Sequence, residues 1–315
     1  MRYVVILTAL LAAVAGEAAA RELRIATWNL EWLMEPRVLR SLRPGCVPAN
    51  ALPRGSARVI PCDVANTQER SNADFAALAR YARKLDADVI AIQEVDGQGP
   101  ARRIFNNYKY CFSGRSHVQN LGFAIRPTLP YRCGGDLALL SLGDSVRRGV
   151  QLTLWPGSAD EMHLLAVHLK SGCGRRTLDS GKAECATLAQ QVPILRQWID
   201  AEAAAGHRFA ILGDFNRDLE WDRGAARNAA GKLSSLWNEL DVPARRLTLA
   251  ANLGAFENCS ITQNFPGYID QIVLGPTLAT RVIAGSMRRL TYENADAASR
   301  RLSDHCPVSI ALRLQ

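Results

Sequence analysis

Carboxylate, amide and imidazole side chains stand at the ends of several apolar stretches of this sequence. These stretches, such as Leu23–Asn29 and Arg208–Phe215, have the alternation or continuous hydrophobicity of half-buried or buried β-strands. Polar groups at the ends of neighbouring strands can converge on one edge of a sheet. The residues placed in this way are Asn29, Glu94, His168, Asp214, Asn216, Asp270, Asp304 and His305.

These residue types suit the hydrolysis of a phosphate ester. A hard divalent cation prefers oxygen ligands, which Glu94 and Asn29 offer, and it offsets the negative charge of a phosphodiester. A neutral imidazole such as that of His305 accepts a proton from water near neutral pH. Asp214 and Asn216 are two residues apart, so on an extended segment their side chains share one face. Each residue alone also has a plain structural explanation, because strand ends and turns are rich in Asp, Asn and Glu.

The elements that must position these residues are mostly strands. One helix is expected at Asn72–Lys84, and another at Lys182–Ala205 with a kink or break at Pro193, which cannot donate a backbone hydrogen bond. Residues 35–70 read as a long loop, and residues 221–260 show no clear pattern. The expected strands are Leu23–Asn29, Asp88–Gln93, Leu121–Arg126, Gly149–Trp155, Met162–Leu169, Arg208–Phe215, Tyr268–Leu274 and Pro307–Leu312.

The order of these elements predicts an α/β fold. Several strands are joined by short links, which favours antiparallel pairing, with Gly149–Trp155 and Met162–Leu169 as a hairpin. Two sheets packed face to face with helices outside them are the simplest arrangement. The sequence contains no internal repeat and no Ser/Gly-rich linker, so we expect one domain from Arg21 to Gln315.

The composition is that of a globular, basic protein. Of the 315 residues, 48% are hydrophobic and 22% charged, which argues against wholesale disorder and against a coiled coil. Lys and Arg number 38 against 30 Asp and Glu, which gives a formal charge of +8. This balance favours an anionic partner, a polyanion or an anionic membrane surface.

Residues 1–20 have the pattern of a secretory signal peptide. Arg2 is followed by an apolar stretch and then by Ala18-Ala19-Ala20, a small-residue cleavage pattern. The stretch is shorter than the roughly 20 residues that a spanning helix needs, so no stable membrane anchor is expected. We therefore predict an exported protein, periplasmic or secreted.

The eight cysteines agree with export, because disulfides persist in oxidising compartments. We expect the pairs Cys46–Cys62, Cys111–Cys133 and Cys173–Cys185, each of which closes a short loop. Cys259 and Cys306 then remain as a fourth pair. Zinc ligation by these cysteines is disfavoured, because the sequence has neither a CxxC pair nor an HExxH motif.

Six motifs in sequence order resemble the endonuclease/exonuclease/phosphatase superfamily, and deoxyribonuclease I in particular. The motifs are TWNLEWL, IQEV, HLKSG, LGDFN, YIDQI and SDHCP. The resemblance spans nearly the whole chain after residue 22, and it implies a four-layer α/β sandwich with two central, mostly antiparallel sheets. It also implies a divalent-metal-dependent phosphoric ester hydrolase.

The resemblance assigns expected roles to the polar residues. It implies that Asn29, Glu94 and Asp304 hold a metal ion, Mg²⁺ with Mn²⁺ or Ca²⁺ as alternatives. The other implied roles belong to catalysis and substrate binding. Asp214 and Asn216 are implied to orient the attacking water and to hold a phosphate oxygen. Asp270 is implied to support His305 as general base or transition-state partner. His168 is implied to assist the leaving group, and Arg147 and Arg148 to lie near the phosphate.

Three functions remain open on the sequence. The basic charge favours a nuclease acting on DNA, RNA or both. A phosphatase or sphingomyelinase-like phospholipase C of the same superfamily is the alternative, although LGDFN continues as Arg217-Asp218, without the Tyr-Arg usual among inositol 5-phosphatases. A binding scaffold without catalysis is a third possibility, against which the complete set of acid, amide and histidine residues argues. Endonuclease and exonuclease action are not distinguished, and no protein partner is indicated.

Overall fold

The computed structural model describes residues 21–53, 58–225, 227–228, 230–231, 234–261 and 263–314. The predicted signal peptide, residues 1–20, lies outside these described residues. None of the helices within the described ranges is both long and apolar enough to cross a membrane.

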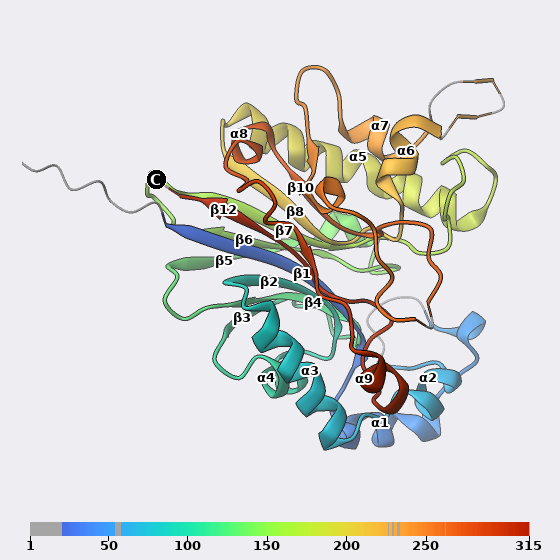
Figure 1. The fold of residues 1–315 in the computed structure, drawn as a ribbon. Helices are drawn as coiled ribbons and strands as arrows, with labels where there is room; N and C mark the ends of the chain where they lie inside the picture. Colours follow the sequence, from blue (N-terminus) through green and yellow to red (C-terminus); the bar gives the residue numbers. More distant parts are fainter. Residues whose placement is uncertain are drawn as a thin grey trace, which may run out of the picture.

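Two six-stranded sheets form the centre of the fold (Figure 1). The first sheet has the strand order β11-β12-β1-β2-β4-β3. Its strands are β1 (Glu22–Leu33), β2 (Val89–Val95), β3 (Lys109–Phe112), β4 (Asn120–Ile125), β11 (Arg288–Arg289) and β12 (Val308–Arg313). Strands β1 and β2 run parallel, and the other pairs in this sheet are antiparallel.

The second sheet has the strand order β5-β6-β7-β8-β10-β9. Its strands are β5 (Tyr131–Leu137), β6 (Gly149–Leu154), β7 (Met162–His168), β8 (Arg208–Asp214), β9 (Thr248–Leu249) and β10 (Asp270–Leu274). Strands β7 and β8 are parallel, whereas β6 and β7 form the predicted antiparallel hairpin. The two sheets are therefore mixed and mostly antiparallel, as expected.

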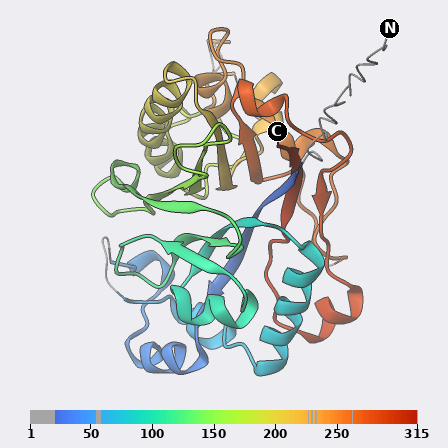
Figure 2. The same cartoon turned by 90° about the vertical axis from the view of Figure 1, so that its left-hand side faces the viewer.

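Helices cover the outer face of each sheet (Figures 1 and 2). The first sheet carries α1 (Pro36–Leu42), α2 (Cys62–Thr67), α3 (Asn72–Leu85), α4 (Gln98–Ile104) and α9 (Asn294–Ser299) on its side of the molecule. The second carries α5 (Ala183–Ala204), α6 (Leu219–Ala225), α7 (Leu236–Leu240) and α8 (Pro276–Ala279). Four short 3₁₀ turns complete these elements, at Arg43–Gly45, Ala49–Ala51, Ala138–Ser141 and Ala250–Leu253.

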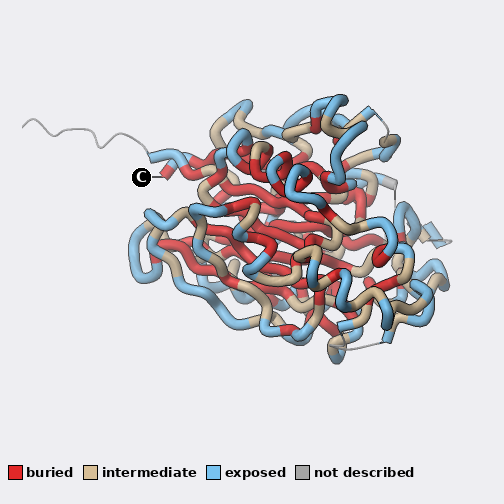
Figure 3. The backbone as a smooth tube through the Cα atoms, turned by 90° about the horizontal axis from the view of Figure 1, so that it is seen from below, coloured by how far each residue is buried: buried red, intermediate tan, exposed pale blue. Residues whose placement is uncertain are grey.

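Alternation along the strands divides the hydrophobic residues into three layers. In β1, Ile25 packs between the two sheets, whereas its neighbour Ala26 packs toward α3. In β7, Leu164 packs between the sheets and Leu165 packs toward α5. Since successive strand residues point to opposite faces, both faces of the central strands are buried, as Figure 3 shows. Helix, sheet, sheet and helix thus form the predicted four-layer sandwich.

All eight cysteines form disulfides, in the four pairs expected: Cys46–Cys62, Cys111–Cys133, Cys173–Cys185 and Cys259–Cys306. Four disulfides suit an oxidising environment.

The structure contains elements that the sequence did not predict, among them β3, β5 and α4. Residues 35–70 contain α1 and α2 instead of a simple loop, since helices of six or seven residues are too short to show a periodic pattern. Of the kink or break expected at Pro193, the break is absent, because helix α5 is continuous from Ala183 to Ala204. Pro193 lies on the exposed side of α5, so water can satisfy the carbonyl group that lacks its helical partner.

Candidate active site

The two parallel strand pairs bring four of the predicted residues to one edge of the sandwich. Strands β1 and β2 are parallel, so Asn29, where the regular pairing of β1 with β2 is interrupted, lies near Glu94 in β2. In the second sheet His168, the last residue of β7, pairs in register with Asp214, the last residue of β8. The edges of the two sheets meet, because the Asn29 amide Nδ2 lies 3.0 Å from Asp214 Oδ2.

Two antiparallel strands begin at the same edge and supply the other charged residues. Asp270 opens β10 and pairs in register with Asp214. His305 lies just before β12, and its Nδ1 lies 2.8 Å from Asp270 Oδ2. The other ring nitrogen, Nε2, is 3.8 Å from both Asp214 Oδ2 and Asp304 Oδ1.

Unusual backbone conformations orient two of these side chains, those of Glu94 and Asp214. Glu94 has a positive φ of 58°, beside a register shift in the pairing of β2. This conformation costs about 1 kcal/mol or more for a non-glycine residue. It directs the Glu94 carboxylate to the backbone N–H of Trp32 at 3.1 Å and to the amide of Gln119 at 2.6 Å.

Gly213 allows Asp214 to sit against β7. Its φ is 152°, and a Cβ atom built there would lie 1.9 Å from the carbonyl oxygen of Val167. No side chain fits this approach, which explains the glycine of the LGDFN motif. The next turn holds the carboxylate, since the backbone N–H of Asn216 donates to Asp214 Oδ1 at 2.7 Å.

His168 completes this group of polar side chains, called the cluster below, from the side of the second sheet. Its Nε2 is 3.4 Å from Asp214 Oδ2 and 3.7 Å from Glu94 Oε1. Burial, reinforced by the positive charges of Arg147 and His305, lowers the pKa of His168 well below its ordinary value. The His168 imidazole is therefore neutral at neutral pH.

The ionisation of His305 is set by the carboxylates around it. Burial opposes its charged form, but Asp270, Asp214 and Asp304 together raise the pKa of His305 well above its ordinary value. Burial raises the pKa of Asp214 to about 7, with His305 opposing the rise and Asp270 adding to it. A protonated imidazole thus lies among three carboxylates at this edge.

A second group of carboxylates fits a divalent cation. Burial raises the pKa of Asp304, with His305 opposing the rise and Glu94 adding to it. Burial and then the charge of Asp304 raise the pKa of Glu31. Glu31 also accepts the backbone N–H of Asp304 at 3.0 Å. The charged forms of Asp304 and Glu31 are thus disfavoured in the metal-free protein, and a divalent cation would stabilise them.

The two arginines predicted near the phosphate differ in their surroundings. Arg147 Nη2 donates to Gln119 Oε1 at 2.8 Å, and Gln119 in turn contacts Glu94. Arg148 pairs with Asp144 at 2.7 Å and with Asp136 at 3.3 Å, and none of its hydrogen bonds or ion pairs within the described ranges reaches the cluster. The structure thus brings Arg147, but not Arg148, beside the cluster.

Two residues at the site were missed by the sequence analysis. Glu31 lies inside TWNLEWL, two residues after Asn29, and that spacing was an available signal. Gln119 precedes β4 in a segment without a motif, and nothing in the sequence distinguished it.

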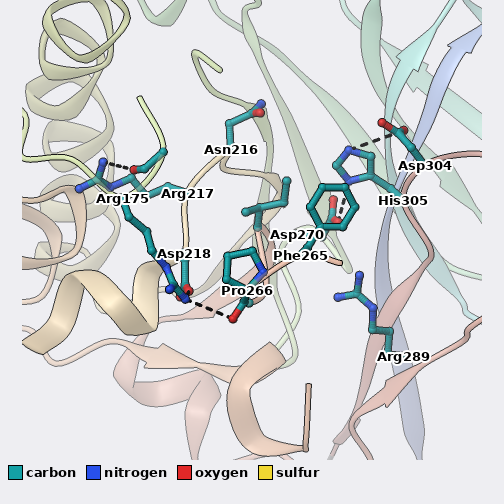
Figure 4. A pocket seen from close by; sticks show the side chains of 13 residues that line it. Arg175, Asn216, Arg217, Asp218, Phe265, Pro266, Asp270, Arg289, Asp304 and His305 are labelled. Carbon is teal, nitrogen blue, oxygen red and sulfur yellow. Dashed lines mark hydrogen bonds and ion pairs between the residues drawn. The ribbon is translucent and has the colours of Figure 1, made fainter. Parts of the chain in front are cut away.

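A pocket of about 200 Å³ opens beside His305 (Figure 4). Phe265 and Pro266 give it an apolar wall, and Arg175 and Arg289 add positive charge. Arg175 is held by Asp218 at 2.6 Å and by the carbonyl oxygen of Pro266 at 3.1 Å. Asp270, Asp304 and His305 also line this pocket, so a bound molecule would lie directly against the candidate catalytic groups.

The chain belongs to the endonuclease/exonuclease/phosphatase family, whose model matches residues 26–305. Members of this family are divalent-metal-dependent phosphoester hydrolases, and this chain is therefore an enzyme of that class.

Several solved structures are similar to this chain. Truncated Caenorhabditis elegans TDP2 has a TM-score of 0.56 at 14% identity, with 93% of this chain and 98% of that chain covered. The 3'-5' exonuclease NExo from Neisseria meningitidis has a TM-score of 0.54 at 17% identity, with 93% and 100% covered. The human nocturnin catalytic domain with bound sulfate has a TM-score of 0.54 at 12% identity, with 92% and 93% covered. No curated protein matches the sequence significantly. At such identities the likeness establishes the fold alone.

The disulfide Cys259–Cys306 adjoins His305 and ties its loop to the segment that carries Phe265. We expect the double variant Cys259→Ser/Cys306→Ser to unfold about 4 kcal/mol more easily, because the bond closes a loop with a sequence separation of 47. We also expect kcat to fall about tenfold at temperatures where the variant is folded, as His305 loses its anchor. Denaturant unfolding and steady-state kinetics measure the two effects.

The matched control is Cys111→Ser/Cys133→Ser, which removes the bond between the edge strands β3 and β5. It should lose stability without a comparable loss of kcat. Equal kcat losses in both double variants would mean that the Cys259–Cys306 bond has no particular role at the site.

Proposed function

We propose that this protein is an exported nuclease that hydrolyses phosphodiester bonds in nucleic acid with the help of a divalent metal ion. The observation that carries the proposal is the convergence of Asn29, Glu94, Asp214, Asp304 and His305 on one edge, beside an open pocket lined by arginine and aromatic side chains. The formal charge of +8 adds a general attraction for a polyanion.

Two of the similar proteins have been solved with DNA products, and this supports nucleic acid as the substrate. One is described as the 3' phosphatase NExo from Neisseria bound to product DNA hairpin, and the other as D. rerio TDP2 complexed with single strand DNA product. Phe265 offers a face on which a base can stack, and the guanidinium of Arg175 next to it suits a phosphate.

We assign the metal ion to the carboxylates of Glu94 and Asp304 together with Asn29, whose Nδ2 contacts Glu94 Oε1 at 3.4 Å and whose Oδ1 accepts the backbone N–H of Glu31 at 3.0 Å. We add Glu31 as a neighbour that orients Asp304. All these donors are oxygen atoms, so Mg²⁺ is the expected ion, with Mn²⁺ or Ca²⁺ as substitutes. When bound, such an ion neutralises charge on the phosphate and makes the phosphorus easier to attack.

The remaining residues divide the proton transfers and the binding of the phosphate. Asp214, held by Asn29 and by the backbone N–H of Asn216, is placed to orient water and to take its proton. The sequence suggested His305 as general base or transition-state partner. We now favour the second role, because a protonated imidazole stabilises a phosphate oxygen but accepts no proton. Asp270 holds the Nδ1 proton and keeps Nε2 facing the substrate. His168 and the Asn216 amide lie beside the phosphate position.

Residues 21–315 would then act as one catalytic domain, released from the signal peptide at residues 1–20. The four disulfides support a periplasmic or secreted location.

A panel of substrates tests this function. The purified mature protein is incubated with plasmid DNA, RNA, sphingomyelin and inositol phosphates, with Mg²⁺ or with EDTA. We expect nucleic-acid cleavage that EDTA abolishes. Release of phosphocholine or inorganic phosphate without nucleic-acid cleavage would replace the proposal by the phospholipase or phosphatase alternative. Binding of one of these substrates without turnover of any of them would favour the third possibility, a binding scaffold without catalysis.

Arg147 and Arg148 provide a matched pair for the binding of substrate. We expect Arg147→Ala to raise KM about tenfold, since Arg147 lies beside Gln119 and Glu94. Arg148→Ala removes the same charge but only breaks ion pairs with Asp144 and Asp136, so its KM should change less than twofold. Steady-state kinetics on an oligonucleotide measure both. Equal increases in KM would show that net charge, and not contact, is responsible.

A further inference from the structure

A second cluster of potential metal ligands lies at the opposite end of the strands that carry the active site. It consists of His163, Glu202 and His207, with Glu161 beside them. His163 is the second residue of β7, whereas His168 ends that strand. Five residues of extended chain span roughly 17 Å, so the cluster is separate from the catalytic edge.

The way in which α5 ends brings His207 to Glu202. Gly206 adopts a left-handed φ of 71°, its N–H donates to the carbonyl of Ala203 at 3.0 Å, and the His207 N–H donates to the carbonyl of Glu202 at 3.0 Å. This pair of bonds is the Schellman arrangement, which turns the chain back sharply after a helix. Any other residue at position 206 would adopt this conformation less easily.

Strand alternation brings His163 to the same place. His163 shares a face of β7 with Leu165 and Val167, which pack against α5. It also pairs in register with Phe209 of β8, just beyond His207. The end of the helix and the starts of two strands therefore meet at Glu202.

The donor atoms of the cluster converge on one point. Nδ1 of His163 and Nδ1 of His207 each lie 2.7 Å from the same oxygen, Oε2 of Glu202. The two rings lie close, with centroids 4.1 Å apart. On the far side of the His163 ring, Nε2 lies 2.9 Å from Glu161 Oε1.

This arrangement leaves His163 with carboxylate oxygens at both ring nitrogens. A neutral imidazole has a single N–H, so one nitrogen lone pair would face a carboxylate unless the ring gains a second proton or a cation. A metal ion at Nδ1 removes the conflict, because Nε2 keeps its proton and donates it to Glu161. A carboxylate that receives the second N–H of a metal-bound histidine is a common support in metal sites.

We propose that His163, His207 and Glu202 bind one divalent transition-metal ion, with Zn²⁺ as the expected occupant. Two imidazole nitrogens and one carboxylate oxygen suit Zn²⁺ far better than Mg²⁺ or Ca²⁺, which prefer oxygen donors throughout. Zinc bonds of about 2.0–2.2 Å need only a small opening of the three donors. The His207 side chain is 41% exposed, so water has access to a fourth position.

The ion would act on stability and not on the reaction. It would join the end of α5 to the starts of β7 and β8, three segments that unfolding separates. Binding to the folded state alone raises the unfolding temperature as the ion concentration rises.

The test measures zinc binding by the mature protein after removal of metal with a chelator and desalting. Titration in competition with a chromophoric chelator gives the number of ions and their affinity, and thermal unfolding with and without Zn²⁺ gives the stabilisation. The variants are His207→Ala and Glu202→Gln, and His117→Gln is the control, since His117 belongs to neither cluster. A further variant, Glu94→Gln/His305→Ala, disables the catalytic edge.

We expect His207→Ala and Glu202→Gln to lose one zinc equivalent, or to bind it at least tenfold more weakly, and to lose the zinc-dependent rise in unfolding temperature. His117→Gln and Glu94→Gln/His305→Ala should keep that equivalent. The Mg²⁺-dependent activity of His207→Ala should stay within twofold of wild type. Unchanged zinc affinity in His207→Ala and Glu202→Gln, or a wild-type protein that takes up no zinc or loses all of it with Glu94→Gln/His305→Ala, would overturn the proposal.

Discussion

Replacement of His305 by alanine is expected to lower kcat for nucleic-acid cleavage about 10³-fold, at the upper part of the range for a group that moves a proton or stabilises the transition state. The loss removes the cation that faces Asp214 and Asp304 across 3.8 Å. It also leaves Asp270 without its histidine partner. Single-turnover kinetics with saturating metal isolate this effect on the chemical step.

The backbone around His305 should survive this substitution. The carbonyl oxygen of His305 accepts hydrogen bonds from Trp28 Nε1 at 3.3 Å and from the Tyr292 hydroxyl, and neither bond involves the imidazole. The unfolding transition of His305→Ala should therefore remain cooperative. His117→Gln is the matched control and should keep its kcat. Full activity in His305→Ala would refute the role assigned to the imidazole.

Asp214→Asn is expected to abolish nearly all turnover and yet to stabilise the metal-free protein. The Asp214 side chain is buried, where a charge is unfavourable. An amide of the same shape keeps the hydrogen bond from the Asn216 backbone and gives up the one that Asn29 Nδ2 donates, and we expect the removal of the buried charge to outweigh that loss. Loss of the proton acceptor should lower kcat 10²- to 10⁴-fold. Loss of turnover together with a gain in stability would mark Asp214 as a functional carboxylate, because replacement of a structural carboxylate would lower stability.

The raised pKa of Asp214 determines how the stability gain of Asp214→Asn depends on pH. The pKa of Asp214 is raised from about 3.8 to about 7 on folding, so the folded state holds the proton more tightly. The stabilisation is complete below the unfolded pKa and is lost as the pH rises through about 7. In chelator, Asp214→Asn should therefore exceed wild type in free energy of unfolding at pH 8, with no gain near pH 4. Urea unfolding at the two pH values measures this, and a variant less stable at pH 8 would contradict it.

The polar edge was predictable because strand ends are easily recognised. Asn29, His168 and Asp214 end apolar runs, and Asp270 and His305 begin them, so parallel and antiparallel pairing both bring them to one edge. Gly213 and the positive φ of Glu94 place backbone constraints on two of these motifs.

Other parts of the site could not be predicted, because they depend on tertiary contacts. Gln119 reaches Glu94 through a segment without periodicity. Arg147 and Arg148 are adjacent in sequence, and only their neighbours distinguish the one beside the cluster from the one in ion pairs. Short helices such as α1 and α2 depend on the packing around Cys46–Cys62 more than on their own sequence.

The central claim is that Glu94 and Asp304, with Asn29, hold the ion on which hydrolysis depends. A crystal of the mature protein soaked in Mn²⁺, measured at the manganese absorption edge, locates that ion by its anomalous scattering. We predict a peak within bonding distance of the Glu94 and Asp304 carboxylates, absent in crystals of Glu94→Gln soaked in the same way. Strong manganese peaks elsewhere, with none between these two carboxylates, would contradict the account.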